Sequence, residues 1–74
     1  MKLAENYILV SPVKDEEKYI ARTIHAVLQQ TLRPSAWIIV DDGSRDRTKT
    51  IAETFASQYP WITVLSLATE AQRQ

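Results

Sequence analysis

The side chains best suited to chemistry are carboxylates, and most of them gather in two short segments. Five of the nine acidic residues belong to these segments, namely Asp15, Glu16, Asp41, Asp42 and Asp46. A sixth, Glu17, directly follows Glu16. Each segment follows a run of four apolar residues, which is typical of a buried strand. Open α/β sheets bind ligands beyond the carboxyl ends of their strands. The two segments therefore predict one ligand site at a shared rim.

The composition excludes several other kinds of site. The chain has 74 residues, with nine Lys and Arg, nine Asp and Glu, and a formal net charge of zero. It contains no Cys, one His and one Gly. These counts exclude a thiol nucleophile, a Cys-based zinc site, a multi-His metal site and the GxGxxG and Walker A loops. The zero net charge argues against binding to nucleic acid through its phosphates.

The sequence predicts no segment that crosses a membrane or directs secretion. The longest uncharged stretch, 54–69, is interrupted by Gln58, Pro60 and several hydroxyls. A membrane-spanning helix needs about 20 mostly apolar residues. The N-terminus lacks the basic start and apolar core of a signal peptide. We therefore expect a cytoplasmic location, and leave open whether a full-length protein associates with a membrane.

Five elements must position the acidic segments. Three apolar runs without alternation predict strands buried on both faces, at 7–10, 37–40 and 61–65. The first strand should stop at Pro12, which cannot donate to a ladder. Apolar residues at helical spacing predict two amphipathic helices between the strands. The first should run from an N-cap at Asp15 to near Thr31, and the second from an N-cap at Ser44 or Asp46 to Pro60.

The order strand, helix, strand, helix, strand predicts an α/β protein. Buried strands joined by helices imply a three-stranded parallel sheet with right-handed crossovers, in the spatial order third, second, first. The whole chain, 1–74, should form one unit without a linker or repeat. This unit looks incomplete, because both helices should cover one face of the sheet while the strands are apolar on both. The first strand would also be an apolar edge, open to self-association.

Motifs at a particular separation carry a resemblance to a known family. Val10-Ser11-Pro12-Val13-Lys14-Asp15-Glu16-Glu17 closes the first strand, Gln29-Gln30-Thr31 ends the first helix, and Asp41-Asp42-Gly43-Ser44-Arg45-Asp46-Arg47-Thr48 follows the second strand. Together they resemble the N-terminal segment of family 2 glycosyltransferases, which are inverting enzymes with the Rossmann-like GT-A fold. The resemblance extends from about Tyr7 to Leu65. It implies that the chain is a partial domain, the N-terminal half of that fold.

The resemblance implies a role for each loop. A full-length enzyme would transfer a sugar, of the hexosyl type, from a UDP- or GDP-sugar to an acceptor hydroxyl in cell-wall or polysaccharide biosynthesis. Asp42 would accept hydrogen bonds from the base, because a carboxylate is an acceptor and uracil and guanine present ring N–H donors. The wall around base and ribose would be formed by Pro12, Val13, Lys14 and Glu16. The residues that support the second loop would be Asp41, Gly43 and Ser44.

The chain departs from the family pattern, and the family's catalytic parts lie further on. Lys14 stands where the family commonly has an aromatic residue, and Asp15 where it has Asn. The family's divalent metal, Mg²⁺ or Mn²⁺, is held by a downstream Asp-x-Asp motif, and the catalytic base follows it. We therefore assign no catalytic or metal residue here and expect the 74-residue chain alone to be inactive. Asp41 and Asp42 should point in opposite directions and so should not form a metal site.

Simpler interpretations stand beside these. Asp15 and Glu16 suit the first turn of a helix for electrostatic reasons alone, and Asp42 suits a plain turn. His25 has no partner in the motifs and is expected to pack or face solvent. The whole chain could instead be a non-catalytic α/β binding or interaction module that completes its sheet against a partner chain.

Overall fold

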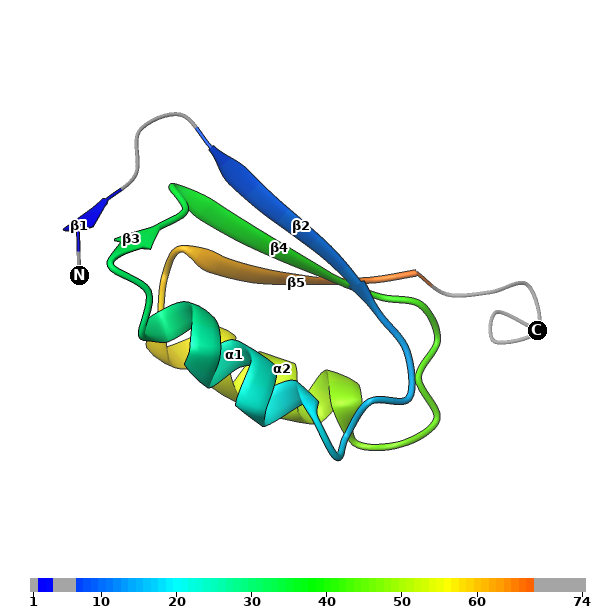
Figure 1. Cartoon of the computed structure of the whole chain (residues 1–74). Helices are drawn as coiled ribbons and strands as arrows, with labels where there is room; N and C mark the ends of the chain where they lie inside the picture. The colour runs from blue at the N-terminus through cyan, green and yellow to red at the C-terminus, as the bar shows by residue number, and fades with distance from the viewer. Residues whose placement is uncertain (1, 4–6, 68–74) are drawn as a thin grey trace.

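The computed structural model describes residues 2–3 and 7–67, in which a three-stranded parallel sheet packs on two helices (Figure 1). The strands are β2 (Ile8–Val13), β4 (Ala36–Asp41) and β5 (Ile62–Ser66), in the order β2-β4-β5. Helix α1 (Ile20–Leu28) follows β2, and helix α2 (Thr48–Gln58) joins β4 to β5. Both ladders are parallel. The predicted α/β class and strand order are confirmed.

A second, two-stranded ladder was not predicted. β1 (Lys2–Leu3) pairs in parallel with β3 (Leu32–Arg33), which precedes β4. Strands of two residues leave no periodicity that a sequence pattern could reveal. The pair lies toward the amino-terminal ends of β2 and β4, away from the acidic loops (Figure 1).

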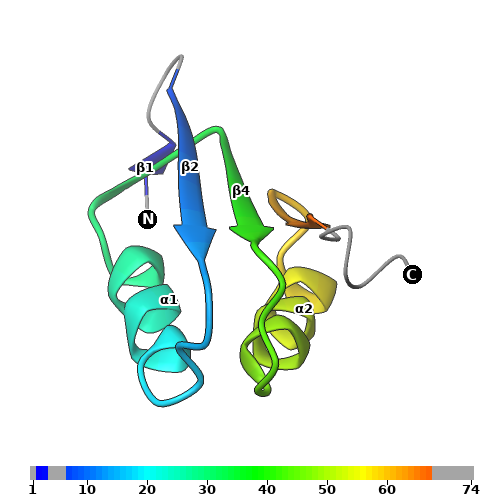
Figure 2. The ribbon, with the colours of Figure 1, turned by 90° about the vertical axis from the view of Figure 1, so that its right-hand side faces the viewer.

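Both helices cover the same face of the sheet, as predicted (Figures 1 and 2). Along β4, Trp37 and Ile39 are 1% and 0% exposed, whereas Ile38 between them is half-buried. The Trp37 ring is anchored by its Nε1, which donates to Ser11 Oγ at 3.0 Å. Buried apolar side chains from both layers form the core: Val13, Ile20, Ile24, Val27, Trp37, Ile39, Ala52 and Ile62. This core fixes β4 between the two helices and thereby fixes the rim that follows it.

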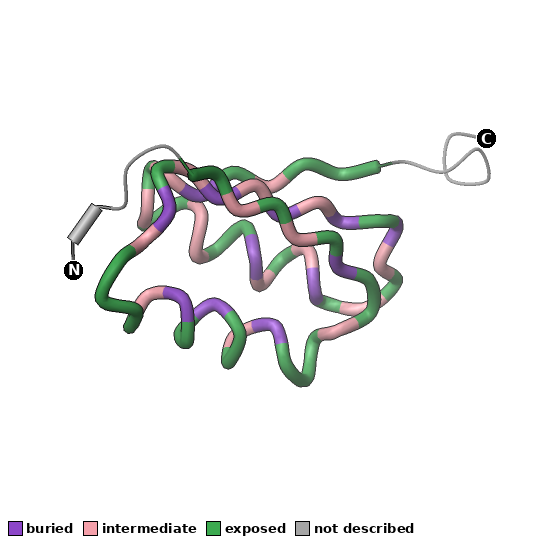
Figure 3. The backbone as a smooth tube through the Cα atoms, turned by 45° about the horizontal axis from the view of Figure 1, so that its top comes forward, coloured by how far each residue is buried: buried purple, intermediate pink, exposed green. Residues whose placement is uncertain are grey.

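The opposite face of the sheet has no covering element within residues 7–67 (Figure 2). Ile8 and Val10 of β2 are 60% and 57% exposed, and Leu65 of β5 is 49% exposed. Along β2 the exposed positions alternate with buried or half-buried ones (Figure 3). The strands are therefore apolar on both faces, as the sequence indicated, while only one face is packed.

The first strand runs beyond its predicted end. β2 continues through Pro12, which aligns with Val40 of β4, so the prediction that Pro12 stops the strand is wrong. β2 is an edge strand, and its Val13 carbonyl faces β4, where it accepts from Asp42 N at 2.9 Å. Neighbouring residues of a strand turn their backbone groups to opposite sides. Pro12 therefore turns its missing N–H toward the open edge, where no ladder bond is lost.

Helix α1 is shorter than predicted at both ends. Asp15 is not its N-cap, because Asp15 has a positive φ of 51° and α1 begins only at Ile20. A turn fills the gap, in which Tyr19 N and Ile20 N donate to the Glu16 carbonyl at 2.9 and 2.8 Å. The helix ends at Leu28 rather than near Thr31. The chain between β2 and α1 is therefore a loop, whose conformation is determined by contacts outside the helix.

Helix α2 also begins later than predicted. Arg47 occupies the N-cap, rather than Ser44 or Asp46, and makes no side-chain capping bond. The Asp46 carboxylate reaches forward instead, and its Oδ1 accepts from Thr48 N at 2.9 Å. Asp46 thus supplies the capping hydrogen bond from one residue before the N-cap. The helix ends at Gln58, just before Pro60, as predicted.

Candidate functional site

The carboxyl ends of β2 and β4 lie side by side and carry the two acidic loops (Figure 2). The register pairs Val13 with Asp41, the last residue of each strand. One residue further on, Asp42 N donates to the Val13 carbonyl at 2.9 Å. The two loops therefore leave the sheet together, and the rim predicted from the sequence is present.

Asp41 and Asp42 lie on opposite sides of the rim. Asp41 is 2% exposed and continues the buried positions of β4. Its Oδ2 accepts from Ser44 N at 3.2 Å, while its buried Oδ1 has no hydrogen-bond partner within the described part of the chain. Asp42, in contrast, is exposed to solvent. Of this pair, only the Asp42 carboxylate is accessible to a ligand.

The rim does not fit a divalent metal ion. A hard cation such as Mg²⁺ needs several oxygen ligands that converge on one point. The Asp41 and Asp42 carboxylates diverge, and residues 7–67 contain no group of three or more His, Cys, Asp or Glu side chains able to hold an ion. No step of a reaction can therefore be assigned to a metal held by this rim.

The predicted nucleotide residues of the first loop differ in exposure. Pro12 and Lys14 are exposed. Glu16 is half-buried, and its Oε2 accepts from Lys14 N at 3.2 Å. Val13 is 7% exposed, and its side chain belongs to the core. The side chains of Pro12, Lys14 and Glu16 therefore remain accessible at the rim, whereas Val13 faces inward and holds Asp42 through its backbone.

Side chains and backbone of the two loops exchange hydrogen bonds, in an arrangement that we call the loop clasp (residues 15–17 and 44–48). In one direction, three consecutive N–H groups of the first loop donate to side chains of the second. These bonds run from Asp15 N to Ser44 Oγ at 2.9 Å, from Glu16 N to Thr48 Oγ1 at 2.7 Å and from Glu17 N to Asp46 Oδ2 at 3.1 Å. The partners are 29 to 32 residues apart in the chain.

The loop clasp also runs in the opposite direction. Arg45 N donates to Asp15 Oδ1 at 2.7 Å, and Arg47 N donates to Glu17 Oε1 at 2.9 Å. Each loop therefore supplies both donors and acceptors to the other. No acidic residue lies in the first turn of α1, so the simpler interpretation of Asp15 and Glu16 as first-turn helix residues is wrong.

Thr48 and Asp46 form the inner end of the loop clasp. Thr48 is fully buried, and its hydroxyl accepts from Glu16 N and donates to Asp46 Oδ1. Partial burial acts to raise the pKa of the Asp46 carboxyl. Hydrogen bonds from the Thr48 side chain and backbone and from Glu17 N outweigh that effect and hold this pKa below its ordinary value. Asp46 is therefore an ionised acceptor at neutral pH.

Gly43 connects the exposed Asp42 to the clasp residue Ser44. Its φ is 73° and the residue is buried, so a side chain at this position would be both strained and crowded. The sequence predicted this requirement, since the chain's one glycine stands in this loop.

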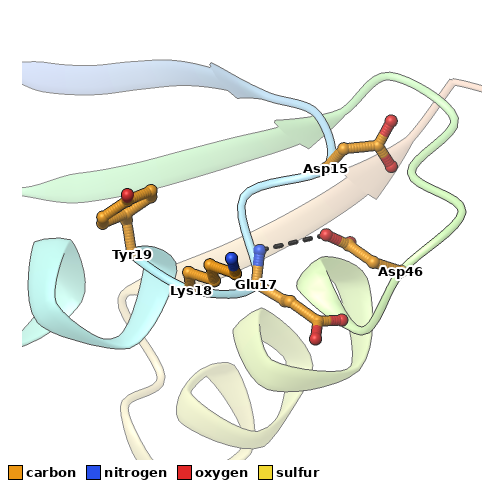
Figure 4. Close-up of a pocket in the computed structure, with 5 residues that line it drawn as sticks. All are labelled: Asp15, Glu17, Lys18, Tyr19 and Asp46. Atoms are coloured by element: carbon orange, nitrogen blue, oxygen red, sulfur yellow. Dashed lines mark hydrogen bonds between the residues drawn. The ribbon is translucent and has the colours of Figure 1, made fainter.

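A pocket of about 450 Å³ lies beside the loop clasp (Figure 4). Its lining residues are Asp15, Glu17, Lys18, Tyr19 and Asp46. The three acids already accept backbone hydrogen bonds within the clasp, and the Glu17–Asp46 bond is visible in Figure 4. None of the predicted nucleotide residues lines this pocket. We therefore treat it as separate from the predicted site.

Glu17 and Thr48 shape the rim, although the sequence pattern gave neither a role in binding. Their partners lie 30 and 32 residues away, so no local spacing connects them. The available signal is the alternation of Ser44, Asp46 and Thr48, whose polar side chains face three successive N–H groups across the rim.

The fold and the rim define a Rossmann-like α/β protein with two acidic loops at the carboxyl edge of a parallel sheet. Comparison with known families identifies the family to which the chain belongs. The family model described as Glycosyl transferase family 2 matches residues 8–71. This match covers most of the chain, and the chain therefore belongs to glycosyltransferase family 2, as the motifs indicated.

A curated relative agrees with this assignment. The chain is 36% identical over 59 residues to glycosyltransferase AglE of Haloferax volcanii. The aligned segment covers 77% of this chain and 19% of that protein, so the chain spans about a fifth of the relative's length. No solved structure matches the chain significantly. Within the described residues, neither helix has the length and apolar character needed to cross a membrane.

Proposed function

We propose that this chain forms the nucleotide-binding part of an inverting glycosyltransferase that uses a UDP- or GDP-sugar. Membership of glycosyltransferase family 2 supports the class of reaction. The pairing of the two loops at the carboxyl ends of β2 and β4 supports the location of the donor site. In a full-length enzyme the sugar, of the hexosyl type, passes to an acceptor hydroxyl in cell-wall or polysaccharide synthesis, in the cytoplasm.

Asp42 is the residue that binds the base in this proposal. The observation that carries it is the contrast between two adjacent carboxylates, since Asp41 is buried while Asp42 is exposed at the rim. An ionised carboxylate only accepts hydrogen bonds, and it therefore complements the ring N–H of uracil or guanine. The bond from Asp42 N to the Val13 carbonyl keeps the residue next to the first loop.

The exposed residues of the first loop complete the proposed wall. Pro12 and Lys14 offer an apolar surface and a cation, and the Lys14 ammonium suits either the edge of the base or a phosphate. Glu16 is half-buried, and one of its oxygens is already bonded to Lys14 N, which leaves the other for a ribose hydroxyl. Val13 contributes through its backbone rather than its side chain.

The chain alone should bind a nucleotide without transferring sugar. It spans 19% of its curated relative, and the metal ligands and catalytic base that the family resemblance implies have no counterpart assigned within it. Incubation of the 74-residue chain with UDP- and GDP-sugars and Mn²⁺ should give no release of nucleoside diphosphate above the uncatalysed rate. Steady turnover by the isolated chain would contradict this part of the proposal.

Isothermal titration calorimetry with UDP and GDP, each with Mn²⁺, tests the site. We expect a Kd of about 1 mM for the better of the two nucleotides, because only part of a donor site is present. Asp42→Ala should abolish measurable binding, whereas Glu53→Ala, which removes the same charge from an exposed position of α2, should bind as the wild type does. Equal binding by the wild type and Asp42→Ala would remove Asp42 from the site.

A second candidate function is a non-catalytic module that completes its sheet against a partner chain. The uncovered face and edge of β2 favour it, since Ile8 and Val10 are 60% and 57% exposed. Size-exclusion chromatography with light scattering distinguishes the candidates. A defined oligomer that Val10→Lys dissociates would support self-association, and a stable monomer at all concentrations would oppose it.

A further inference from the structure

We propose that Asp15 and Glu17 are positioning residues, which hold the loop of Asp42 in the conformation that binds the base. This inference rests on the proposed function, in which Asp42 contacts the nucleotide. Neither acid belongs to the proposed wall of the nucleotide site. Each instead commits one carboxylate oxygen to a backbone N–H of the second loop, Asp15 Oδ1 to Arg45 and Glu17 Oε1 to Arg47.

Asp42 lies in a short segment that is fastened to the first loop at both ends. On one side, Asp42 N donates to the Val13 carbonyl at 2.9 Å. On the other side, Ser44 Oγ accepts from Asp15 N at 2.9 Å, and Arg45 N donates back to Asp15 Oδ1 at 2.7 Å. With both ends fixed, the position of the Asp42 carboxylate relative to the first loop depends on these bonds.

The loop clasp repeats the same exchange two residues further along each loop. Glu17 N donates to Asp46 Oδ2 at 3.1 Å, and Arg47 N donates to Glu17 Oε1 at 2.9 Å. Asp15 and Glu17 thus each give one N–H and accept another from the opposite loop. The acceptors of the returning bonds are carboxylates, and charge-assisted hydrogen bonds are roughly twice as strong as neutral ones.

The backbone of Asp15 is adapted to this role. Its φ of 51° lies in the left-handed region, which Asp and Asn enter more readily than most residues. This conformation allows the Asp15 N–H and carboxylate to face the second loop together, as the bonds to Ser44 and Arg45 require. A loop that is already ordered loses less conformational entropy when a nucleotide binds, so the loop clasp should raise the affinity for the nucleotide.

Two double variants separate the effect of the hydrogen bonds on binding from the effect of the charges. Asp15→Gly with Glu17→Ala, which we call the cut variant, removes both acceptors, and Gly adopts the positive φ without strain. Asp15→Asn with Glu17→Gln, the matched variant, removes the same two charges but keeps an amide oxygen as acceptor at each position. UDP and GDP, each with Mn²⁺, are titrated onto both variants and the wild type.

The cut variant should bind the nucleotide about tenfold more weakly than the wild type, as expected for the net loss of about one hydrogen bond to a charged acceptor. The matched variant should bind only about threefold more weakly than the wild type, because a neutral amide acceptor keeps about half of the strength of each bond. Wild-type affinity in the cut variant, or equal weakening in both variants, would overturn the proposal.

Amide hydrogen exchange measured by NMR tests the loop clasp in the absence of a nucleotide. Exchange at Asp42, Gly43, Arg45 and Arg47 should be faster in the cut variant than in the wild type and the matched variant. If the wild type binds neither nucleotide, the proposed function fails, but the exchange data still test the positioning role. Faster exchange at Asp42 in the cut variant than in the wild type would support that role. Unchanged exchange at Asp42 would overturn it. If circular dichroism finds the cut variant unfolded, Glu17→Ala against Glu17→Gln gives the same comparison.

Discussion

Replacement of Thr48 by Val should destabilise the protein more than any other exchange of similar shape in α2. Thr48 is fully buried where α2 begins, directly behind the rim. Its hydroxyl accepts from Glu16 N at 2.7 Å and donates to Asp46 Oδ1. Val fills the same space, so the core contacts are kept and the change isolates the hydroxyl.

The expected cost follows from the group that is left without a partner. Glu16 N is part-buried and loses its acceptor, and an unsatisfied buried donor costs about 1–3 kcal/mol. We therefore expect the free energy of unfolding to fall by about 2 kcal/mol. A core of this size rarely supplies more than about 3–5 kcal/mol in total, so the variant should lose a large part of its stability.

Urea unfolding monitored by Trp fluorescence measures this loss, since Trp37 lies in the core. Thr50→Val is the matched control, because Thr50 is exposed on the same helix and should change the free energy of unfolding by less than about 0.5 kcal/mol. Thr48→Ser, which keeps the hydroxyl, should recover part of the loss. A Thr48→Val protein as stable as the Thr50→Val control would refute the assignment of Thr48 to the clasp.

Three further predictions test other parts of the structure. Gly43→Ala should lower the free energy of unfolding by about 1 kcal/mol or more, because φ is 73° and the residue is buried, and urea unfolding at the wild-type midpoint would contradict this. Ile39→Ala should lower the free energy of unfolding by about 2–5 kcal/mol, because Ile39 is fully buried. Val10 is 57% exposed, so Val10→Ala should lower it far less, and equal losses would contradict the assignment of Ile39 to the core. The lowered pKa of Asp46 means that its carboxylate stabilises the fold above the unfolded value of 3.8 and loses this effect as pH falls through the lower folded value. The stability difference between wild type and Asp46→Asn should therefore be constant near neutral pH and shrink below pH 3.8, and a difference independent of pH would argue against the bonds to Asp46.

The framework of this fold was predictable because its signals are local. The apolar runs at Trp37–Val40 and Trp61–Leu65 have no alternation, and both became strands of a parallel sheet, β4 and β5. The adjacency of the two acidic loops followed from topology alone, since parallel neighbours end at the same edge. Gly43 was likewise identifiable, because a lone glycine beside two aspartates marks a turn.

Other features depend on distant partners, and for that reason local patterns missed them. Pro12 was expected to end β2, but at a sheet edge its missing N–H faces the open side, and edge position is a property of the whole sheet. Asp15 is a residue type that favours the N-cap of a helix, yet its carboxylate accepts from Arg45 N, which lies 30 residues away. Val13 carried a binding role by resemblance, whereas its side chain packs in the core.

Chemical-shift mapping by NMR tests the central claim most directly, because it locates a bound nucleotide on the rim without relying on turnover. The ¹⁵N-labelled chain is titrated with UDP and GDP in the presence of Mg²⁺. The proposed site predicts that the amide shifts induced by one of the two nucleotides cluster at residues 13–17 and 41–44 and disappear in Asp42→Ala. Shifts centred on other residues, or no shifts at nucleotide concentrations well above about 1 mM, would contradict the proposal that this chain binds the donor nucleotide through Asp42.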